Sequence, residues 1–383
     1  MTSTSFTVTP WEVKGEIDYE KIIKEFGVKR IDEPLMHRLS KLAPLHLFLR
    51  RKLFFAHRDL DVVLDEHEKG RKVVLYTGRG PSGHTHLGHL VPWIFTRWLQ
   101  KAFKAKLYFQ MTDDEKFLVK DLSLEQTTNY AKENALDLIA LGFEPHDTKI
   151  IYDTEHIREL YPFALKIAKR TTFSTAKAVF GFDNSTNIGL SFFPALQAAV
   201  AFYAQQQVGM AGGEKAADAG KNVQCLIPCA IDQDPYWRIA RDAAPYLGYQ
   251  KPATILSKFL PGLSGPAGKM SASDAANAIY TTDKPEDARK KVMRAFTGGQ
   301  PTIDEQRKKG GNPDICTVCQ WLNLLFEEDD DVMQQRLKDY RAGKILDGEN
   351  KKYLADKVVA FLEEHQRKRE KARDVIEKYS LTA

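Results

Sequence analysis

The chain has 383 residues, of which 43% are hydrophobic and 28% are charged, and its formal net charge is +5. These values are typical of a soluble globular protein with a sizeable core and two or three domains, and they give only weak support to a polyanionic partner. Four cysteines are too few for a disulfide framework and indicate a reducing compartment. No secretory signal is visible, and no apolar run approaches the roughly 20 residues of a membrane span. We therefore expect a cytoplasmic protein without a membrane partner.

Residues 1–70 combine short apolar periods with charge and are expected to form an N-terminal extension. Within it, residues 17–27 have the period of a helix that a glycine closes, and a second helix ends near Gly70. The β-branched run 72–77 then predicts a buried strand with a glycine-rich break behind it.

A βαβ unit is the clearest pattern in the first half of the chain. After the strand 72–77 and its glycine turn, apolar residues recur at helical spacing over 87–99, and 106–111 is the next predicted strand. This order predicts the fold class α/β, with a parallel, doubly wound sheet of the Rossmann type.

The rest of the chain is predicted to be mostly helical. Residues 112–205 carry two expected capping boxes, which begin at Thr112 and Ser123. A strand is predicted at 223–228. From about residue 285 the chain becomes strongly charged and helical, which predicts a separate helical domain.

The glycine turn from Gly78 to Gly83 matches the dinucleotide pattern G-x-G-x-x-G. A dinucleotide site needs an acidic residue roughly 20 positions later, at the end of the second strand, but no Asp or Glu lies between Gly83 and Asp113. This argues against a dehydrogenase and against a bound redox cofactor. A P-loop is also excluded, because Lys221 has the wrong glycine spacing and precedes Asn222 instead of a Ser or Thr.

Two histidines, His86 and His89, lie three residues apart at the start of the predicted helix and share one face. A helix N-terminus suits phosphates, and imidazoles there can donate hydrogen bonds to an oxyanion. Gly88 leaves room for a flat nucleotide base. The alternatives are two ordinary surface histidines or a metal site, although no third ligand is evident nearby.

A second polar motif, Lys269-Met270-Ser271-Ala272-Ser273, follows a segment rich in glycine and proline. A flexible backbone before a lysine and two hydroxyls predicts a mobile loop that closes over phosphates and supplies charge in the transition state. Taken alone, the same string also fits any solvated loop.

His86-Leu87-Gly88-His89 followed by this lysine motif resembles the two signatures of the class I aminoacyl-tRNA synthetases. The first signature has Leu87 where isoleucine is usual, and the second has Ala272 where many members carry a lysine. Four further segments resemble the tryptophanyl-tRNA synthetases of the eukaryotic and archaeal type. They are residues 75–82, 110–116, 193–199 and 229–236.

The resemblance implies an enzyme that activates L-tryptophan with ATP and Mg²⁺ and transfers it to tRNA(Trp). It implies a class I Rossmann catalytic domain over residues 71–284, with a helical connective insertion at about 117–222. It also implies a helical anticodon-binding domain over 285–383, whose last helix packs back on the catalytic domain. A homodimer built on the insertion is a further implication.

The resemblance also assigns site residues. Tyr76 and Gln110 would accept the hydrogen of the indole N–H, and Glu115 would meet the ammonium group. Glu115 has an alternative role, because its spacing from Thr112 is that of a capping box. The remaining expected residues are Gln197 and Gln233 for the amino acid, Thr77, Gly78, Arg79, Gly80, Gly88 and Met270 for the nucleotide, and His86, His89, Lys269, Ser271 and Ser273 for catalysis.

Two cysteine pairs, Cys225 with Cys229 and Cys316 with Cys319, invite a zinc interpretation that would need all four thiolates to converge. The second pair lies in an apolar, helix-like run, where cysteine behaves as a small hydrophobe. We therefore expect no structural zinc and no other metal site.

Two alternative functions stay open. A tyrosyl-tRNA synthetase shares the fold and both signatures, but a phenol needs both a donor and an acceptor, usually an aspartate, so Gln110 favours indole. A synthetase-like paralogue that binds tryptophan or tRNA without catalysis is the second alternative, and the intact signature residues argue against it.

Overall fold

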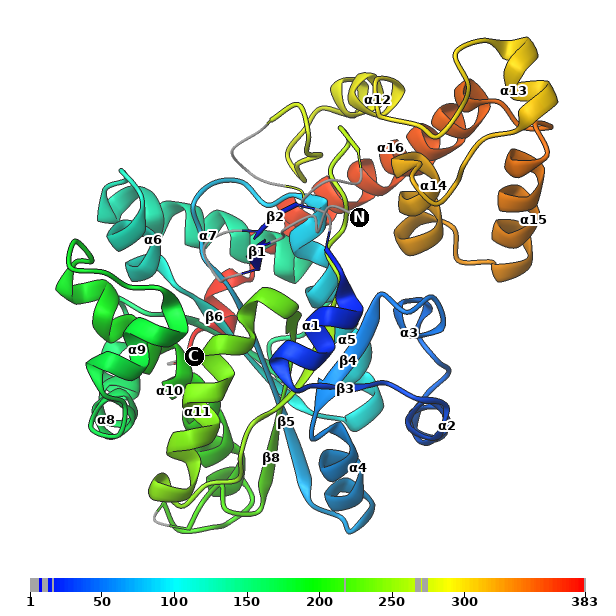
Figure 1. The fold of residues 1–383 in the computed structure, drawn as a ribbon. Coiled ribbons are helices and arrows are strands. Elements are labelled where there is room, and N and C mark those ends of the chain that lie inside the picture. Colours follow the sequence, from blue (N-terminus) through cyan, green and yellow to red (C-terminus); the bar gives the residue numbers. More distant parts are fainter. Residues whose placement is uncertain are drawn as a thin grey trace.

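The computed structural model describes residues 7–8, 13–15, 17–216, 218–265, 270 and 275–381. Its centre is a seven-stranded sheet, and a lobe of helices lies to one side of it (Figure 1). A two-stranded sheet of β1 (Thr7–Val8) and β2 (Val13–Lys14) lies near the start of the chain. In spatial order the strands of the large sheet are β3 (Lys29–Arg30), β4 (Phe54–Arg58), β9 (Ala253–Ser257), β8 (Val223–Ala230), β5 (Lys72–Arg79), β6 (Lys106–Met111) and β7 (Thr148–Tyr152).

The strands β9, β8, β5, β6 and β7 are parallel, whereas β3 and β4 pair antiparallel at one edge. The central strand β5 has β6 on one side and β8 on the other, so the winding of the chain reverses between β5 and β8. Open α/β sheets bind ligands at the carboxyl ends of the strands that flank such a switch point. The predicted Rossmann-type α/β fold is confirmed.

Helices cover both faces of the sheet, because successive side chains of a strand point to opposite faces. Val73 and Leu75 of β5 belong to one hydrophobic core, and Val74 and Tyr76 belong to the other. The first core includes α4 (Leu60–Glu68), α5 (Leu87–Phe103) and α7 (Leu124–Ala140), and the second includes α8 (Ile157–Ala168), α10 (Ile188–Ala211) and α11 (Asp234–Leu247). The other helices around the sheet are α1 (Tyr19–Phe26), α2 (Glu33–Leu42), α3 (Leu47–Arg50), α6 (Asp113–Val119), α9 (Phe173–Phe180), η1 (Ile231–Gln233) and η3 (Ile376–Tyr379).

The sequence did not predict the strands β1, β2, β3, β4, β7 and β9. The strand β7 falls inside the segment 112–205, which was expected to be mainly helical, and β4 falls inside the N-terminal extension. Both are five-residue runs, and a short apolar run has no periodicity that separates a strand from a buried helix. The expected insertion at about 117–222 therefore contains a strand of the main sheet, and the domain boundaries stay a prediction.

The helix α10 corrects the statement that no apolar run approaches the length of a membrane span. By length and composition alone it is apolar enough to cross a bilayer, but 67% of its apolar window is buried inside the protein. It packs between α8, α11 and the strands β5 and β8. A helix with apolar residues on all sides is typical of a buried core helix.

The helical lobe is tied back to the sheet by its last helix. It comprises α12 (Pro285–Met293), α13 (Ile303–Lys309), α14 (Thr317–Trp321), η2 (Leu322–Phe326), α15 (Asp330–Arg341) and α16 (Asp347–Ala372). Figure 1 shows α16 running from this lobe to α7 beside the sheet. There Nε2 of His365 lies 3.0 Å from Oδ1 of Asp137. Arg369 and Arg373 both form ion pairs with Glu133, at 2.6 and 2.8 Å.

Candidate active site

A cavity of about 270 Å³ opens at the carboxyl ends of β5, β6 and β8. All of the predicted site residues that lie in the described part of the chain line it. These are Tyr76, Thr77, Gly78, Arg79, Gly80, His86, Gly88, His89, Gln110, Glu115, Gln197, Gln233 and Met270. The remaining predicted residues, Lys269, Ser271 and Ser273, lie outside the described residues. The structure thus brings the described candidates into one cavity, while the role of each stays a prediction.

Tyr76 and Gln110 are hydrogen-bonded to each other on the neighbouring strands β5 and β6. The Tyr76 hydroxyl donates to Oε1 of Gln110 and also lies 3.0 Å from the carbonyl oxygen of Gln197. Complete burial raises the pKa of Tyr76 well above its ordinary value, so the phenol keeps its proton at neutral pH. Because that proton is directed at these oxygens, the phenol oxygen can serve any further group only as an acceptor.

The Gln110 amide is held from behind by a residue that the sequence analysis did not single out. Nε2 of Gln110 lies 2.8 Å from each carboxyl oxygen of Asp153, which is 1% exposed. This contact directs Oε1 of Gln110 toward Tyr76. Asp153 directly follows β7. A carboxyl at the end of a strand would have indicated a site residue, but this strand was itself not predicted.

The first turn of α6 places Glu115 on the cavity. Its carboxylate accepts a hydrogen bond from the Thr112 hydroxyl at 2.8 Å and pairs with Nζ of Lys116 at 2.7 Å. The expected capping box at Thr112 is wrong, because the Thr112 side chain donates to the carboxylate and accepts no backbone N–H. The box that begins at Ser123 is confirmed. The contact of Glu115 with the substrate stays a prediction.

The histidine pair lies at the N-terminus of α5. The backbone N–H of His86 donates to Nδ1 of His89 at 3.1 Å, so neutral His89 carries its proton on Nε2. The two rings stack with their centroids 3.4 Å apart. A Cβ added to Gly88 would lie 3.1 Å from Nδ1 of His86 and 3.6 Å from Cβ of Met270. A side chain at Gly88 would therefore crowd the signature.

Arg79 ends β5 at the beginning of the glycine turn. Its Nε donates to Oδ1 of Asn134 on α7 at 3.1 Å, and Nδ2 of Asn134 donates to the carbonyl oxygen of Gly83 at 3.0 Å. Burial lowers the pKa of Arg79 to about 10, which leaves the guanidinium charged at neutral pH. Its Nη2 is buried without an acceptor among the described residues. A buried cation with an unused donor suits an incoming anion.

Glycine at position 80 keeps this turn close to α6. A Cβ there would lie 2.8 Å from Oε2 of Glu115 and 2.9 Å from Nζ of Lys116. Lys116 also lines the cavity and was not among the predicted residues. It therefore adds a cation next to the glycine turn.

Several aromatic residues that line the cavity were also missed. Trp237 packs edge-on against Tyr76 with the ring centroids 5.2 Å apart, and its Nε1 donates to Sγ of Cys229 at 3.3 Å. Tyr236 is 1% exposed and lines the same wall. The signal for them was indirect, since they lie in or beside the segment 229–236 that carried the family resemblance. The neighbouring Asp234 forms ion pairs with Arg58 and Arg238, both at 2.7 Å, which suits a structural role.

The four cysteines are buried and free. Cys225 and Cys229 lie within β8, and Sγ of Cys316 accepts the backbone N–H of Cys319 at the start of α14, over 3.5 Å. Both pairs lie in hydrophobic cores, where a thiol packs as a small apolar group. The expectation that the protein holds no structural zinc stays a prediction, which metal analysis of the purified protein tests.

The parallel sheet is of the Rossmann type, and the helix that follows its first parallel strand carries a histidine pair at its N-terminus. This combination is that of a class I aminoacyl-tRNA synthetase. Residues 68–363 match the family model of the class I tRNA synthetases for W and Y. The chain is 51% identical to the tryptophan--tRNA ligase of Saccharolobus solfataricus, over 97% of this chain and 94% of that protein. It is 49% identical to that of Pyrococcus furiosus, over 98% and 94%.

Solved structures agree with these relatives. The tryptophanyl-tRNA synthetase from Giardia lamblia superimposes with a TM-score of 0.88 at 38% identity, over 95% of this chain and 96% of that one. The enzyme from Encephalitozoon cuniculi, solved bound to tryptophan, gives a TM-score of 0.85 at 37% identity, over 96% and 99%. The chain belongs to the tryptophan--tRNA ligases of the class I synthetase family.

Proposed function

We propose that this chain, as a tryptophan--tRNA ligase, performs both steps of its reaction at the cavity above β5, β6 and β8. In the first step a carboxylate oxygen of L-tryptophan attacks the α-phosphorus of ATP. The bond to the β-phosphate oxygen breaks, pyrophosphate leaves with the electron pair, and tryptophanyl-adenylate remains. In the second step a 3′-terminal ribose hydroxyl of tRNA(Trp) attacks the acyl carbon, loses its proton, and AMP leaves.

Tryptophan recognition is proposed to depend on two acceptors for one donor. The indole N–H would meet the phenol oxygen of Tyr76 and Oε1 of Gln110, which are hydrogen-bonded to each other and line the cavity. The carboxylate of Glu115 would meet the ammonium group, and Gln197 and Gln233 would contact the amino-acid moiety. A phenol in place of the indole would need a donor as well as an acceptor at this point, which argues against a tyrosyl-tRNA synthetase.

ATP is proposed to enter as its magnesium complex, with the metal carried by the phosphates of the substrate. The backbone of Thr77, Gly78 and Gly80 and the N-terminus of α5 would hold the nucleotide, because helix N-termini favour phosphate. Arg79, His86 and His89 also line the cavity and would supply hydrogen-bond donors to the phosphates. The catalytic contribution is positioning and charge stabilisation, without a covalent enzyme intermediate. Lys269, Ser271, Ser273 and Met270 are proposed to complete it from the second signature.

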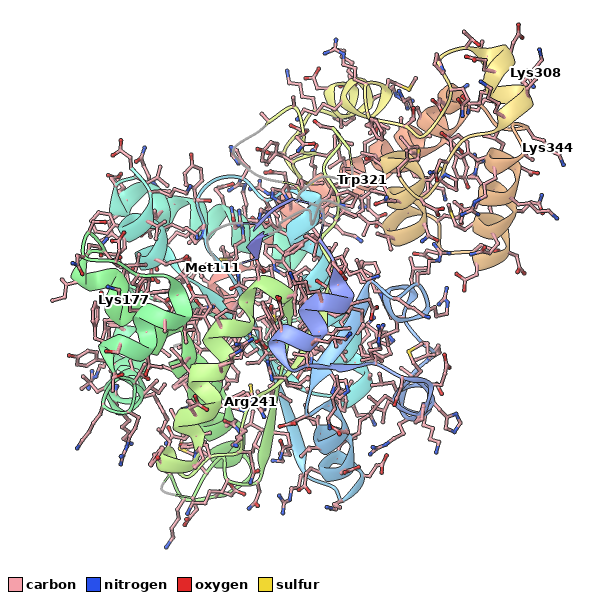
Figure 2. All side chains as sticks on the ribbon, in the orientation of Figure 1. Met111, Lys177, Arg241, Lys308, Trp321 and Lys344 are labelled. Carbon is pink, nitrogen blue, oxygen red and sulfur yellow. The ribbon has the colours of Figure 1, made fainter. Side chains whose placement is uncertain are left out.

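The helical lobe is proposed to bind the anticodon region of tRNA. Its outer end carries exposed basic residues, and Figure 2 shows Lys308 and Lys344 pointing away from the body of the protein there. Basic side chains on an outer face suit a phosphate backbone. We accordingly propose the division into a catalytic domain over 71–284 and an anticodon-binding domain over 285–383.

A homodimer built on the insertion is proposed from its exposed apolar residues. Tyr161, Leu165, Phe173 and Ile188 on α8, α9 and α10 are 48%, 47%, 57% and 90% exposed. Apolar side chains gathered on neighbouring helices mark an interaction surface.

Four free cysteines suit a reducing compartment, and we propose that the enzyme works in the cytoplasm.

The observation that carries the proposal is the hydrogen-bonded pair of Tyr76 and Gln110 in a cavity that residues of the first signature also line. The test is ATP–pyrophosphate exchange with tryptophan and with tyrosine, followed by charging of tRNA(Trp). We expect exchange that depends on tryptophan, with tyrosine a poor substrate. Preference for tyrosine would identify a tyrosyl-tRNA synthetase, and tryptophan binding without exchange would identify a non-catalytic paralogue.

A further inference from the structure

We propose that Asp153 is a positioning residue that determines selectivity for the indole N–H, by holding the Gln110 amide in one of its two orientations. The proposal rests on the function given above, since it requires that Gln110 contacts the indole. Asp153 is not one of the residues that line the cavity, so it acts through Gln110 and not on the substrate.

A glutamine amide has two faces of nearly equal shape, one an oxygen acceptor and the other an NH₂ donor. With Nε2 of Gln110 lying 2.8 Å from each oxygen of Asp153, the acceptor faces Tyr76. Rotating the amide by half a turn would direct its oxygen at the oxygens of Asp153. The NH₂ group would then face the indole N–H, so that a donor would oppose a donor.

Asp153 is itself held in place by the backbone. Its N–H donates to the carbonyl oxygen of Met111 at 3.2 Å, and its side chain is 1% exposed. The next residue, Thr154, donates its own N–H to Oδ1 of Asp113 at 3.2 Å. These two hydrogen bonds connect the end of β7 to the end of β6 and to the start of α6, and they fix the backbone that carries the Asp153 carboxyl.

The protonation of Asp153 is consistent with this role. Burial and the neighbouring carboxyl of Asp114 raise the pKa of Asp153 well above its ordinary value. A neutral carboxyl that donates its proton toward Asp114 still presents a carbonyl oxygen to Nε2 of Gln110. Asparagine offers the same acceptor and a donor of similar shape, whereas alanine offers neither.

The test compares tryptophan with an analogue in which sulfur replaces the indole N–H, a 3-benzothienyl alanine. The ratio of kcat/KM for the two substrates in ATP–pyrophosphate exchange reports only the recognition of the N–H. In Asp153→Ala we expect this ratio to fall by about tenfold, since the amide is no longer directed and a hydrogen bond of ordinary strength is lost. In Asp153→Asn we expect it to stay within about twofold of wild type.

Two controls separate this role from a general effect on folding. Glu155→Ala changes an exposed carboxylate two residues along the chain and should leave the ratio unchanged. Asp153→Ser keeps a buried polar group, but the serine side chain is too short to reach Gln110, so this variant should behave like Asp153→Ala. If Asp153→Ala does not fold, Asp153→Ser provides the test.

The outcomes point to different conclusions. If Asp153→Ala or Asp153→Ser lowers both rates equally and leaves the ratio at the wild-type value, Asp153 is merely structural and the proposal is overturned. A ratio that falls as far in Asp153→Asn as in Asp153→Ala also overturns it. If the wild-type protein itself does not distinguish the two substrates, the assignment of Tyr76 and Gln110 to the indole is wrong instead.

Discussion

The side-chain amide of Asn134 on α7 connects Arg79 at the end of β5 with the far end of the glycine turn. Its oxygen accepts from Nε of Arg79 at 3.1 Å, and its nitrogen donates to the carbonyl oxygen of Gly83 at 3.0 Å. One side chain, 1% exposed, therefore sets both the direction of a cationic donor and the shape of the turn. Asparagine is suited to this position because it carries a donor and an acceptor on one rigid group.

Asn134→Ala removes both hydrogen bonds and leaves Arg79 and the turn without a brace. We expect kcat/KM for ATP to fall by about 10- to 100-fold, as for the loss of one or two buried hydrogen bonds to a charged group. Tryptophan binding should change little. Asn129→Ala on the exposed side of the same helix is the matched control, and pyrophosphate exchange at varied ATP is the measurement. Wild-type ATP kinetics in Asn134→Ala would show that Arg79 needs no positioning.

Removing the indole acceptors one at a time should have unequal effects. Tyr76→Phe leaves Gln110 in place, and we expect kcat/KM for tryptophan to fall by about 0.5–1.5 kcal/mol, or up to roughly tenfold. Gln110→Ala also opens a void beside Asp153 and should cost about 2–3 kcal/mol. The double variant should lose more than the sum, because the indole N–H is then buried without an acceptor. Tyrosine should stay a poor substrate in all three variants.

The second signature supplies a prediction from the sequence alone. Lys269→Ala should slow adenylate formation by about 10²- to 10³-fold with little change in tryptophan affinity, because a charge on the departing pyrophosphate matters chiefly in the transition state. Stopped-flow measurement of activation, with the exposed Lys251→Ala as a control, gives the comparison. Activation at the wild-type rate would remove Lys269 from the mechanism.

Asp114 should make the stability of the protein depend on pH. Burial, with the nearby carboxylates of Asp113 and Glu115, raises its pKa to about 7, and it shares a hydrogen bond with Asp153. A carboxyl whose pKa is higher in the folded state stabilises the fold fully below about pH 4, and this contribution is lost as the pH rises through 7. Asparagine cannot ionise, so the free energy of unfolding of Asp114→Asn should fall less between pH 4 and 7 than that of wild type. The slopes of the two proteins against pH should differ by the equivalent of roughly one proton. Urea unfolding at several pH values measures the slope, and identical slopes in both proteins would contradict the prediction.

The sequence predicted the strands β5, β6 and β8 because each is an apolar run followed by a glycine turn, a helix start or another strong boundary signal. It could not predict β7, since five residues carry too little periodicity. Asp153 was missed for the same reason, because its contact with Gln110 exists only once β7 pairs with β6. The capping box at Thr112 was wrong because spacing does not tell whether the side chains of Thr112 and Glu115 bond to the backbone or to each other. The family resemblance, by contrast, pointed to Tyr76 and Gln110, and the structure brings these two residues together in the cavity.

The return of α16 to α7 has a consequence for how the enzyme is made. Glu133 and Asp137 find their partners in Arg369 and His365, which are 236 and 228 residues further along the chain. At a synthesis rate of about 5–20 residues per second, roughly 10 to 50 seconds separate the appearance of the two halves of this contact on the ribosome. Until α16 has been synthesised, α7, the helix that carries Asn134, lacks these contacts. We expect nascent chains released before α16 to be devoid of ATP-dependent activity, so that only a completed polypeptide competes for tRNA with a working nucleotide site.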